Sequence, residues 1–388
     1  MPPPPPLSKT RLVCISDTHN QTPKLPRGDV LICAGDFSNQ GARGEVRGFV
    51  EWVAKAGFER VVVVGGNHDI TLDTPFYTQH WPHFHNQSKQ SPQECRALLT
   101  NSPSITYLQH ESAIIKLSSP TGPHTQFSVF GSPYSPAHKL WAFGYEPDAA
   151  KVLWDGIPMD ADVVVTHTPP AGHCDGQVST DGRAGCEELR RRLWSVRPML
   201  HICGHIHEGR GVEKVRWRDG IARAPFMEDG VEVWKDPGAG VGNGKQSLVD
   251  LTGRGRGRGV GFSTSLETCG GGGGNAGFSG EGKGRLPTER ELDGIAKVDS
   301  KGARLKNVLD RSYSRAVRDL AQRSSEDRGW DEQDGDIVLE PRISRGEVRQ
   351  GRRETCIVNA AIMASNWGGA KKFNKPIVVD IDLPVWEE

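Results

Sequence analysis

The 388-residue sequence lacks an excess of charge of either sign, because 48 lysines and arginines match 48 aspartates and glutamates. Balanced charge provides no overall field that would draw the chain to nucleic acid or to an anionic membrane. The sequence also lacks an apolar run long enough to cross a bilayer, and MPPPPPLSKT at the N-terminus has no apolar core of a secretion signal. We therefore expect a cytoplasmic protein without membrane or nucleic-acid partners.

Paired cysteine spacing is also absent, since none of the eight cysteines forms a C-x-x-C motif. Cys14, Cys33 and Cys203 lie inside apolar, strand-like runs, where a free thiol packs as a small hydrophobic group. This pattern favours a reducing compartment over a disulfide-bonded scaffold.

Hydrophobic residues are scarce at 36%, whereas 47 glycines and 26 prolines are present. This composition predicts a globular part diluted by unstructured sequence. We expect a disordered, proline-rich segment over 1–10 and an ordered domain over 11–217. A glycine-rich, charged and mostly disordered insertion over 218–353 follows, because such a segment cannot bury enough apolar surface to offset its ordering entropy. Two strands in 354–388 would then complete the domain.

Apolar runs alternate with helical patterns along the ordered part. The alternation predicts an α/β fold with parallel strands, to which a hairpin over 113–119 and 126–132 adds antiparallel pairing. The predicted strands are 11–16, 29–34, 60–65, 161–166 and 199–204, and the predicted helices include 41–56 and 186–196.

A polar cluster follows each of these strands. Taken singly, each cluster is an ordinary turn sequence or an ordinary hydrogen-bonded histidine. Because the carboxyl ends of parallel strands meet at one sheet edge, we expect the side chains to converge. Imidazole and carboxylate groups suit divalent Zn, Mn or Fe, and this number of ligands suits two ions about 3.5–4 Å apart. The residues are Asp17 and His19, Asp36, Asn67 to Asp69, His167, and His205 with His207.

The order D-x-H, GD, GNHD, H and GHxH resembles the calcineurin-like metallophosphoesterases, and CISDTH, GSPYSP and VVVTHTPPAGHCD are similar to its metallophosphoesterase-domain (MPPED) branch. The resemblance implies a four-layer α/β/β/α sandwich of two mixed sheets. It also implies two divalent ions, Mn²⁺ being favoured, with Fe, Zn or Mg as alternatives. One ion would be held by Asp17, His19 and His207, the other by Asn67, His167 and His205, and Asp36 would bridge them.

The function implied is hydrolysis of small phosphodiesters, such as cyclic nucleotides, by in-line attack of a metal-activated water. His68 would contact the phosphate together with Asn67, and it would protonate the leaving oxygen as general acid. Asp69 either orients His68 or only forms the turn. Arg210 either contacts an anionic substrate or lies on an exposed loop.

Two other functions stay open. A phosphomonoesterase or protein phosphatase would be expected to carry arginines beside the GD and GNH loops, and GDFSNQG and GGNHD have none. The alternative from a different functional class is a scaffold or interaction protein that has the phosphoesterase fold. The sequence does not indicate an oligomeric state.

Other aromatic and histidine residues are predicted to be structural. His80, His83 and His85 are expected on the surface of an irregular loop. Tyr134 and Trp141 could form the floor of a nucleobase pocket, but packing is the favoured interpretation.

Overall fold

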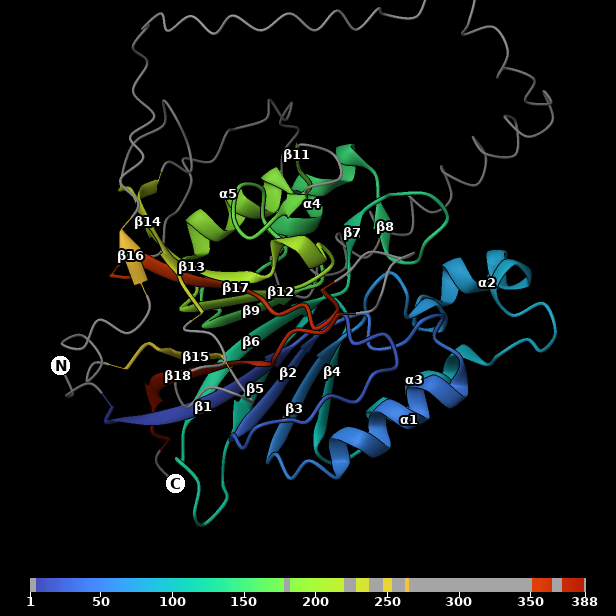
Figure 1. The fold of residues 1–388 in the computed structure, drawn as a ribbon, viewed down its shortest axis with the longest axis horizontal. Helices are drawn as coiled ribbons and strands as arrows, with labels where there is room; N and C mark the ends of the chain where they lie inside the picture. Colours follow the sequence, from blue (N-terminus) through green and yellow to red (C-terminus); the bar gives the residue numbers. More distant parts are fainter. Residues whose placement is uncertain are drawn as a thin grey trace, which may run out of the picture.

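The computed structural model describes residues 5–177, 182–219, 228–236, 247–252, 262–264, 351–364 and 372–386. Two β-sheets lie face to face, and helices cover the outer face of each sheet (Figure 1). This arrangement confirms the predicted α/β/β/α sandwich of two mixed sheets. No helix in these residues is both long enough and apolar enough to cross a membrane.

The first sheet has six strands in the order β15-β18-β1-β2-β3-β4. Strands β1 to β4 are parallel, whereas β18 pairs antiparallel with β1. Their unbroken apolar runs suit a sheet that is covered on both faces. The bounds are β1 (Leu7–Ile15), β2 (Val30–Ala34), β3 (Arg60–Val64), β4 (Ile105–Leu108), β15 (Ser247–Asp250) and β18 (Ile377–Pro384).

The second sheet has eight strands in the order β16-β14-β13-β17-β12-β9-β6-β5. Its centre, β6-β9-β12-β17, is parallel, and the predicted β5–β6 hairpin is confirmed as an antiparallel pair. The bounds are β5 (Glu111–Lys116), β6 (Gln126–Ser132), β9 (Val163–Thr166), β12 (Leu200–Cys203), β13 (Gly211–Trp217), β14 (Glu228–Trp234), β16 (Phe262–Thr264) and β17 (Glu354–Asn359). Two short pairs lie outside the sheets, β7 (Ser135–Pro136) with β8 (Gly144–Tyr145) and β10 (Gly176–Gln177) with β11 (Gly182–Arg183).

Helices α1 (Arg43–Ala54) and α3 (Pro92–Thr100) lie outside the first sheet, and α4 (Ala150–Asp155) and α5 (Glu187–Val196) lie outside the second (Figure 1). Successive side chains of a strand point to opposite faces. Leu12 and Cys14 of β1 therefore pack between the sheets, while Val13 and Ile15 pack beneath the helices. This two-sided burial holds the carboxyl ends of the strands in place.

Some elements differ from the prediction. Strand β1 begins at Leu7, inside the range predicted as an unstructured lead-in, because it pairs with β18. Strands β14, β15 and β16 lie within 218–353, although the pairing of β14 with β13 is the hairpin that the apolar runs VEKVRW and GVEVW indicate. Most of the remaining insertion lies outside the described residues, so the division of the chain at 217/218 and 353/354 stays a prediction.

Helix α2 (Thr74–Phe84) contains His80 and His83, where an irregular loop was expected. That expectation was wrong because Pro82 and several residues of low helix propensity weaken the sequence pattern that would predict a helix. The start signals were present, since Asp73 caps the first turn by accepting from the backbone N–H of Phe76 at 3.1 Å.

His201 on β12 predicts a pH dependence of stability. The imidazole is fully buried and its Nε2 lies 2.8 Å from Oγ1 of Thr166. Burial lowers the pKa of His201 from 6.5 to about 3. As the pH falls, His201 is protonated in the unfolded chain at a higher pH than in the folded protein. The folding stability that is present above pH 6.5 is therefore lost on acidification. We expect roughly 3 kcal/mol less unfolding free energy by about pH 4.

Urea unfolding of the wild type and of His201→Gln at several pH values checks this expectation. The variant should be less stable at neutral pH but should lose less stability on acidification. Parallel pH profiles of the two proteins would show that His201 does not contribute.

Candidate metal centre

The predicted polar residues lie in the loops that follow β1, β2 and β3 of the first sheet and β9 and β12 of the second. The carboxyl ends of these parallel strands point to the same end of the sandwich, so the loops meet there. The structure brings all seven predicted ligands into one connected cluster. They are Asp17, His19, Asp36, Asn67, His167, His205 and His207.

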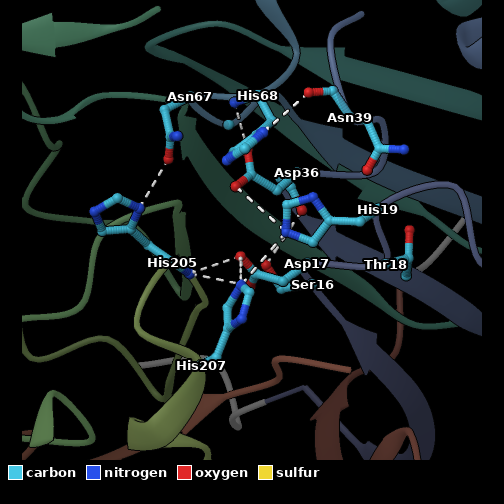
Figure 2. A network of polar contacts seen from close by, with 12 residues as sticks. Ser16, Asp17, Thr18, His19, Asp36, Asn39, Asn67, His68, His205 and His207 are labelled. Atoms are coloured by element: carbon cyan, nitrogen blue, oxygen red, sulfur yellow. Dashed lines mark hydrogen bonds and ion pairs between the residues drawn. The ribbon is translucent and has the colours of Figure 1, made fainter. Parts of the chain in front are cut away.

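One side of the cluster consists of Asp17, His19 and His207. The Nε2 atom of His207 lies 3.3 Å from Oδ1 of Asp17 and 3.4 Å from Nε2 of His19 (Figure 2). Asp17 and His19 are almost fully buried, whereas His207 is partly exposed. Three ligand atoms thus converge at a position that solvent reaches from the His207 side.

The other side consists of Asn67, His167 and His205. The Oδ1 atom of Asn67 lies 3.0 Å from Nε2 of His167 and 2.8 Å from Nδ1 of His205. Nδ1 of His167 lies 2.9 Å from the carbonyl oxygen of Ala34 and must donate to it, because a carbonyl only accepts. Metal-binding histidines commonly donate their second ring nitrogen in this way, which turns the lone pair of Nε2 toward the metal.

Asp36 lies between the two sides. Its Oδ2 atom is 3.4 Å from Nε2 of His167 and 3.9 Å from Nε2 of His19. Its Oδ1 atom accepts from the backbone N–H of His68 at 2.8 Å. One carboxylate therefore faces both groups of ligands, as a bridging ligand would.

The backbone at the cluster adopts an unusual conformation. Asp17, His19, Asp36 and His205 have φ values of 52°, 45°, 52° and 65°. Residues with a side chain adopt this left-handed region at a cost that the surrounding structure must offset, and such residues gather at functional sites. A contact that helps to offset this cost is the hydrogen bond from the backbone N–H of His205 to Oδ2 of Asp17 at 3.0 Å.

The charges at the cluster suit a cation. Burial alone would raise the pKa of Asp36, but the neighbouring His167 and His68 bring it well below its usual range. Burial lowers the pKa of His19 to about 4 and, with the charge of His167, that of His205 to about 3. Burial opposes a proton on His167 as well, yet Asp36 raises its pKa to about 9. The cluster thus combines ionised carboxylates at Asp17 and Asp36 with neutral imidazoles at His19 and His205, and a metal ion would replace the Nε2 proton of His167.

Gly66 allows the loop after β3 to approach the cluster closely. A Cβ atom at this position would lie 2.3 Å from Oδ1 of Asp36 and 2.7 Å from Cε1 of His167. We expect Gly66→Ala to displace these side chains and to weaken divalent metal binding by about 10- to 100-fold. Calorimetric titration of metal-stripped protein with Mn²⁺ measures this affinity.

Gly48→Ala is the matched control, because an added Cβ there meets nothing within 4 Å. Equal metal affinity in Gly66→Ala and Gly48→Ala would contradict the proposed packing.

His68 lies at the rim of the cluster (Figure 2). Its Nδ1 atom donates to the carbonyl oxygen of Asn39 at 2.9 Å, and its ring meets that of His19 edge-on with centroids 4.7 Å apart. His19, Asp36 and His68 each offer a ligand atom within 4.8 Å of the others. The tautomer is fixed by Asn39, which leaves Nε2 as the nitrogen that can exchange a proton with a substrate.

Asp69 fastens the loop after β3 to the loop after β2. Its carboxylate accepts from the backbone N–H and the hydroxyl of Ser38 at 3.0 and 2.6 Å, and from the backbone N–H of Gly66 at 2.8 Å. Burial and the charge of Asp36 raise the pKa of Asp69 to about 8. Ser38 and Asn39 were not among the predicted site residues, although both belong to the GDFSNQG loop. That Asp69 orients His68 stays a prediction.

Two further residues connect the last ligand loop to the sheets. The Nη2 atom of Arg210 donates to Oγ of Ser247 at 3.1 Å and to the carbonyl oxygen of Lys375 at 2.9 Å, which ties the loop to the first sheet. Its side chain is only 13% exposed, so the expectation of an exposed loop arginine was wrong, and its contact with substrate stays a prediction. Asn359, missed in the sequence, donates from Nδ2 to the carbonyl oxygen of Ile206 at 2.9 Å and supports the His205–His207 turn. A polar residue closing the apolar run TCIVN was the available signal.

Comparisons with known proteins identify several relatives of this chain. Human Metallophosphoesterase domain-containing protein 1 is 37% identical over 220 residues, which cover 54% of this chain and 64% of that protein. A UPF0046 protein of Caenorhabditis elegans is 31% identical over 216 residues, which cover 53% of this chain and 71% of that protein. Probable rhamnogalacturonate lyase C of Emericella nidulans is 39% identical over 209 residues, which cover only 18% of its length. The chain therefore spans less than two thirds of the human and Emericella relatives.

Among solved structures, purple acid phosphatase PPD1 from yellow lupin (Lupinus luteus) is similar with a TM-score of 0.31 and 12% identity, covering 56% of this chain and 41% of that one. The Calcineurin-like phosphoesterase family model matches residues 10–209, just over half of the chain and a range that contains all seven predicted ligands. The predicted resemblance is thereby confirmed, and the chain belongs to the calcineurin-like phosphoesterase family.

Proposed function

We propose that this chain is a dinuclear metal-dependent phosphodiesterase for small substrates such as cyclic nucleotides. Calcineurin-like phosphoesterases use dinuclear divalent metal centres, and family membership supports a phosphoesterase hydrolase. The observation that carries the proposal is the position of Asp36, whose Oδ2 atom faces His167 on one side and His19 on the other.

In this proposal one ion would be held by Asp17, His19 and His207, and the other by Asn67, His167 and His205. Asp36 would be a ligand to both, and Mn²⁺ is the favoured metal. Two bound divalent ions lower the pKa of a coordinated water and neutralise charge on phosphoryl oxygens. The buried carboxylates and neutral imidazoles supply the donor types that such ions bind.

His68 acts as the general acid. Its Nδ1–H is engaged by Asn39, so Nε2 of the imidazolium donates its proton to the oxygen of the departing group. Asn67 and His68 lie on the same turn, and in this proposal both would contact the phosphate. A covalent enzyme intermediate is not required, because the attacking group is water.

The distribution of arginine favours a diester over a monoester. A monoester dianion needs additional positive charge, and neither the 35–41 loop nor the 65–69 loop contains an arginine. Arg43, next in sequence, pairs with Glu94 at 2.8 Å. Arg210 is held by Ser247 and Lys375. The cytoplasmic location and the absence of membrane or nucleic-acid partners remain predictions.

The test uses metal-stripped full-length chain titrated with Mn²⁺ and supplied with bis(p-nitrophenyl) phosphate or p-nitrophenyl phosphate. We expect diester turnover that appears only with metal, which would justify a screen of cyclic nucleotides. Preference for the monoester would support the phosphomonoesterase or protein phosphatase instead. Metal binding without any turnover would support a scaffold.

A further inference from the structure

Trp141 covers one face of His68. The two ring centroids are 4.1 Å apart and the ring planes are inclined by 35°. His19 meets the same imidazole edge-on, and Asn39 accepts its Nδ1–H. The imidazole is thus confined by a carbonyl group, a second imidazole and the indole of Trp141.

The loop that carries Trp141 is anchored at both ends. Strands β7 and β8 pair at its base, where Ser135 faces Gly144. Next to Trp141, the backbone N–H of Ala142 donates to the carbonyl oxygen of Asn67 at 3.3 Å. The backbone N–H of the buried Phe143 donates to Oδ2 of Asp73 at 2.7 Å. The loop is therefore fastened to the same turn that presents His68.

A second aromatic ring supports Trp141 from α2. The ring of Phe84 lies 5.9 Å from that of Trp141, and Phe76 lies 5.9 Å from Phe84. Phe76 belongs to the core beneath the helices, and Phe84 packs against it. This row of rings connects the position of Trp141 to the packed interior, so Trp141 is held by more than its own loop.

We propose that Trp141 is a positioning residue that keeps Nε2 of His68 directed at the leaving oxygen. The hydrogen bond to Asn39 fixes the Nδ1 atom, and the indole face of Trp141, together with the ring of His19, limits tilting of the imidazole about that atom. Proton transfer depends steeply on such alignment. The inference rests on the proposed function, in which His68 is the proton donor.

The first experiment compares Trp141→Leu with the wild type on methyl phenyl phosphate and methyl p-nitrophenyl phosphate. Phenolate is the more basic leaving group and depends more on protonation. We expect kcat for the phenyl ester to fall about tenfold or more with little change in KM, and a smaller loss for the nitrophenyl ester. Trp141→Phe should recover most of the rate, and Trp52→Leu, a half-buried tryptophan of α1, should behave as wild type.

A double-mutant cycle separates positioning from direct contact with substrate. If Trp141 acts through His68, adding Trp141→Leu to His68→Ala should cause no further loss. If the full loss persists in that background, or appears in KM alone, the indole contacts the substrate and the proposal is wrong.

A readout that does not require activity distinguishes this inference from the proposed function. In metal-stripped protein, the imidazole C–H resonances of His68, assigned with His68→Ala, should move when Trp141→Leu removes the indole ring current. They should not move in Trp52→Leu. Unmoved resonances would overturn the inference, whereas moved resonances without hydrolysis in any protein would refute the proposed function on which it rests.

Discussion

Asp36→Asn is expected to reduce phosphodiester hydrolysis on the order of 10³-fold, which corresponds to about 4 kcal/mol of transition-state stabilisation. The substitution keeps the shape of the side chain but removes the charge that faces both His19 and His167. It should also reduce the divalent ions bound per chain from about two to one or fewer. Metal analysis after gel filtration and steady-state kinetics with bis(p-nitrophenyl) phosphate measure the two effects.

Asp160→Asn is the matched control, because this exposed carboxylate precedes β9, at the opposite end of that strand from His167. It should retain wild-type metal content and turnover. An Asp36→Asn protein that keeps two tightly bound ions and near-normal rates would contradict a bridging role for this carboxylate.

His68→Ala is expected to lower kcat for the diester by about 10²–10⁴-fold while leaving the number of bound metal ions unchanged. The reason is that His68 lies at the rim of the cluster, with Nδ1 occupied by Asn39, and is not one of the seven predicted ligands. The loss should be larger for a basic leaving group than for p-nitrophenolate. Steady-state kinetics over a series of leaving groups, together with metal analysis, provides the measurement.

His83→Ala is the control, since this histidine lies on the exposed side of α2. If His68→Ala instead removed a metal ion, His68 would be a ligand and a different group would have to supply the proton.

The clustering of the predicted ligands could be foreseen because each of these residues follows the carboxyl end of a strand. An apolar run such as RVVVV predicts a buried strand, and the polar residues after it must lie at the strand's carboxyl end. Applied to β1, β2, β3, β9 and β12, this rule brings Asp17, Asp36, Asn67, His167 and His205 together without knowledge of the sheet order.

Contacts between loops distant in sequence could not be predicted. Asp69 binds Ser38 across 31 residues, and no local pattern distinguishes it from an ordinary turn aspartate. Trp141 reaches His68 only because β7 and β8 close its loop. Residues 7–10 are extended because β18, near the other end of the chain, pairs with them. The pairing with β18 thus determines the conformation of residues 7–10, although the proline-rich composition of residues 1–10 predicts an unstructured segment.

The most direct test of the central claim is the metal content of the full-length chain reconstituted with Mn²⁺. Elemental analysis and electron paramagnetic resonance on one sample report the number of ions and whether they interact. The proposed function predicts about two Mn²⁺ per chain, with the exchange-coupled spectrum of ions about 3.5–4 Å apart. One isolated ion per chain, or two ions with uncoupled spectra, would contradict a dinuclear centre built around Asp36.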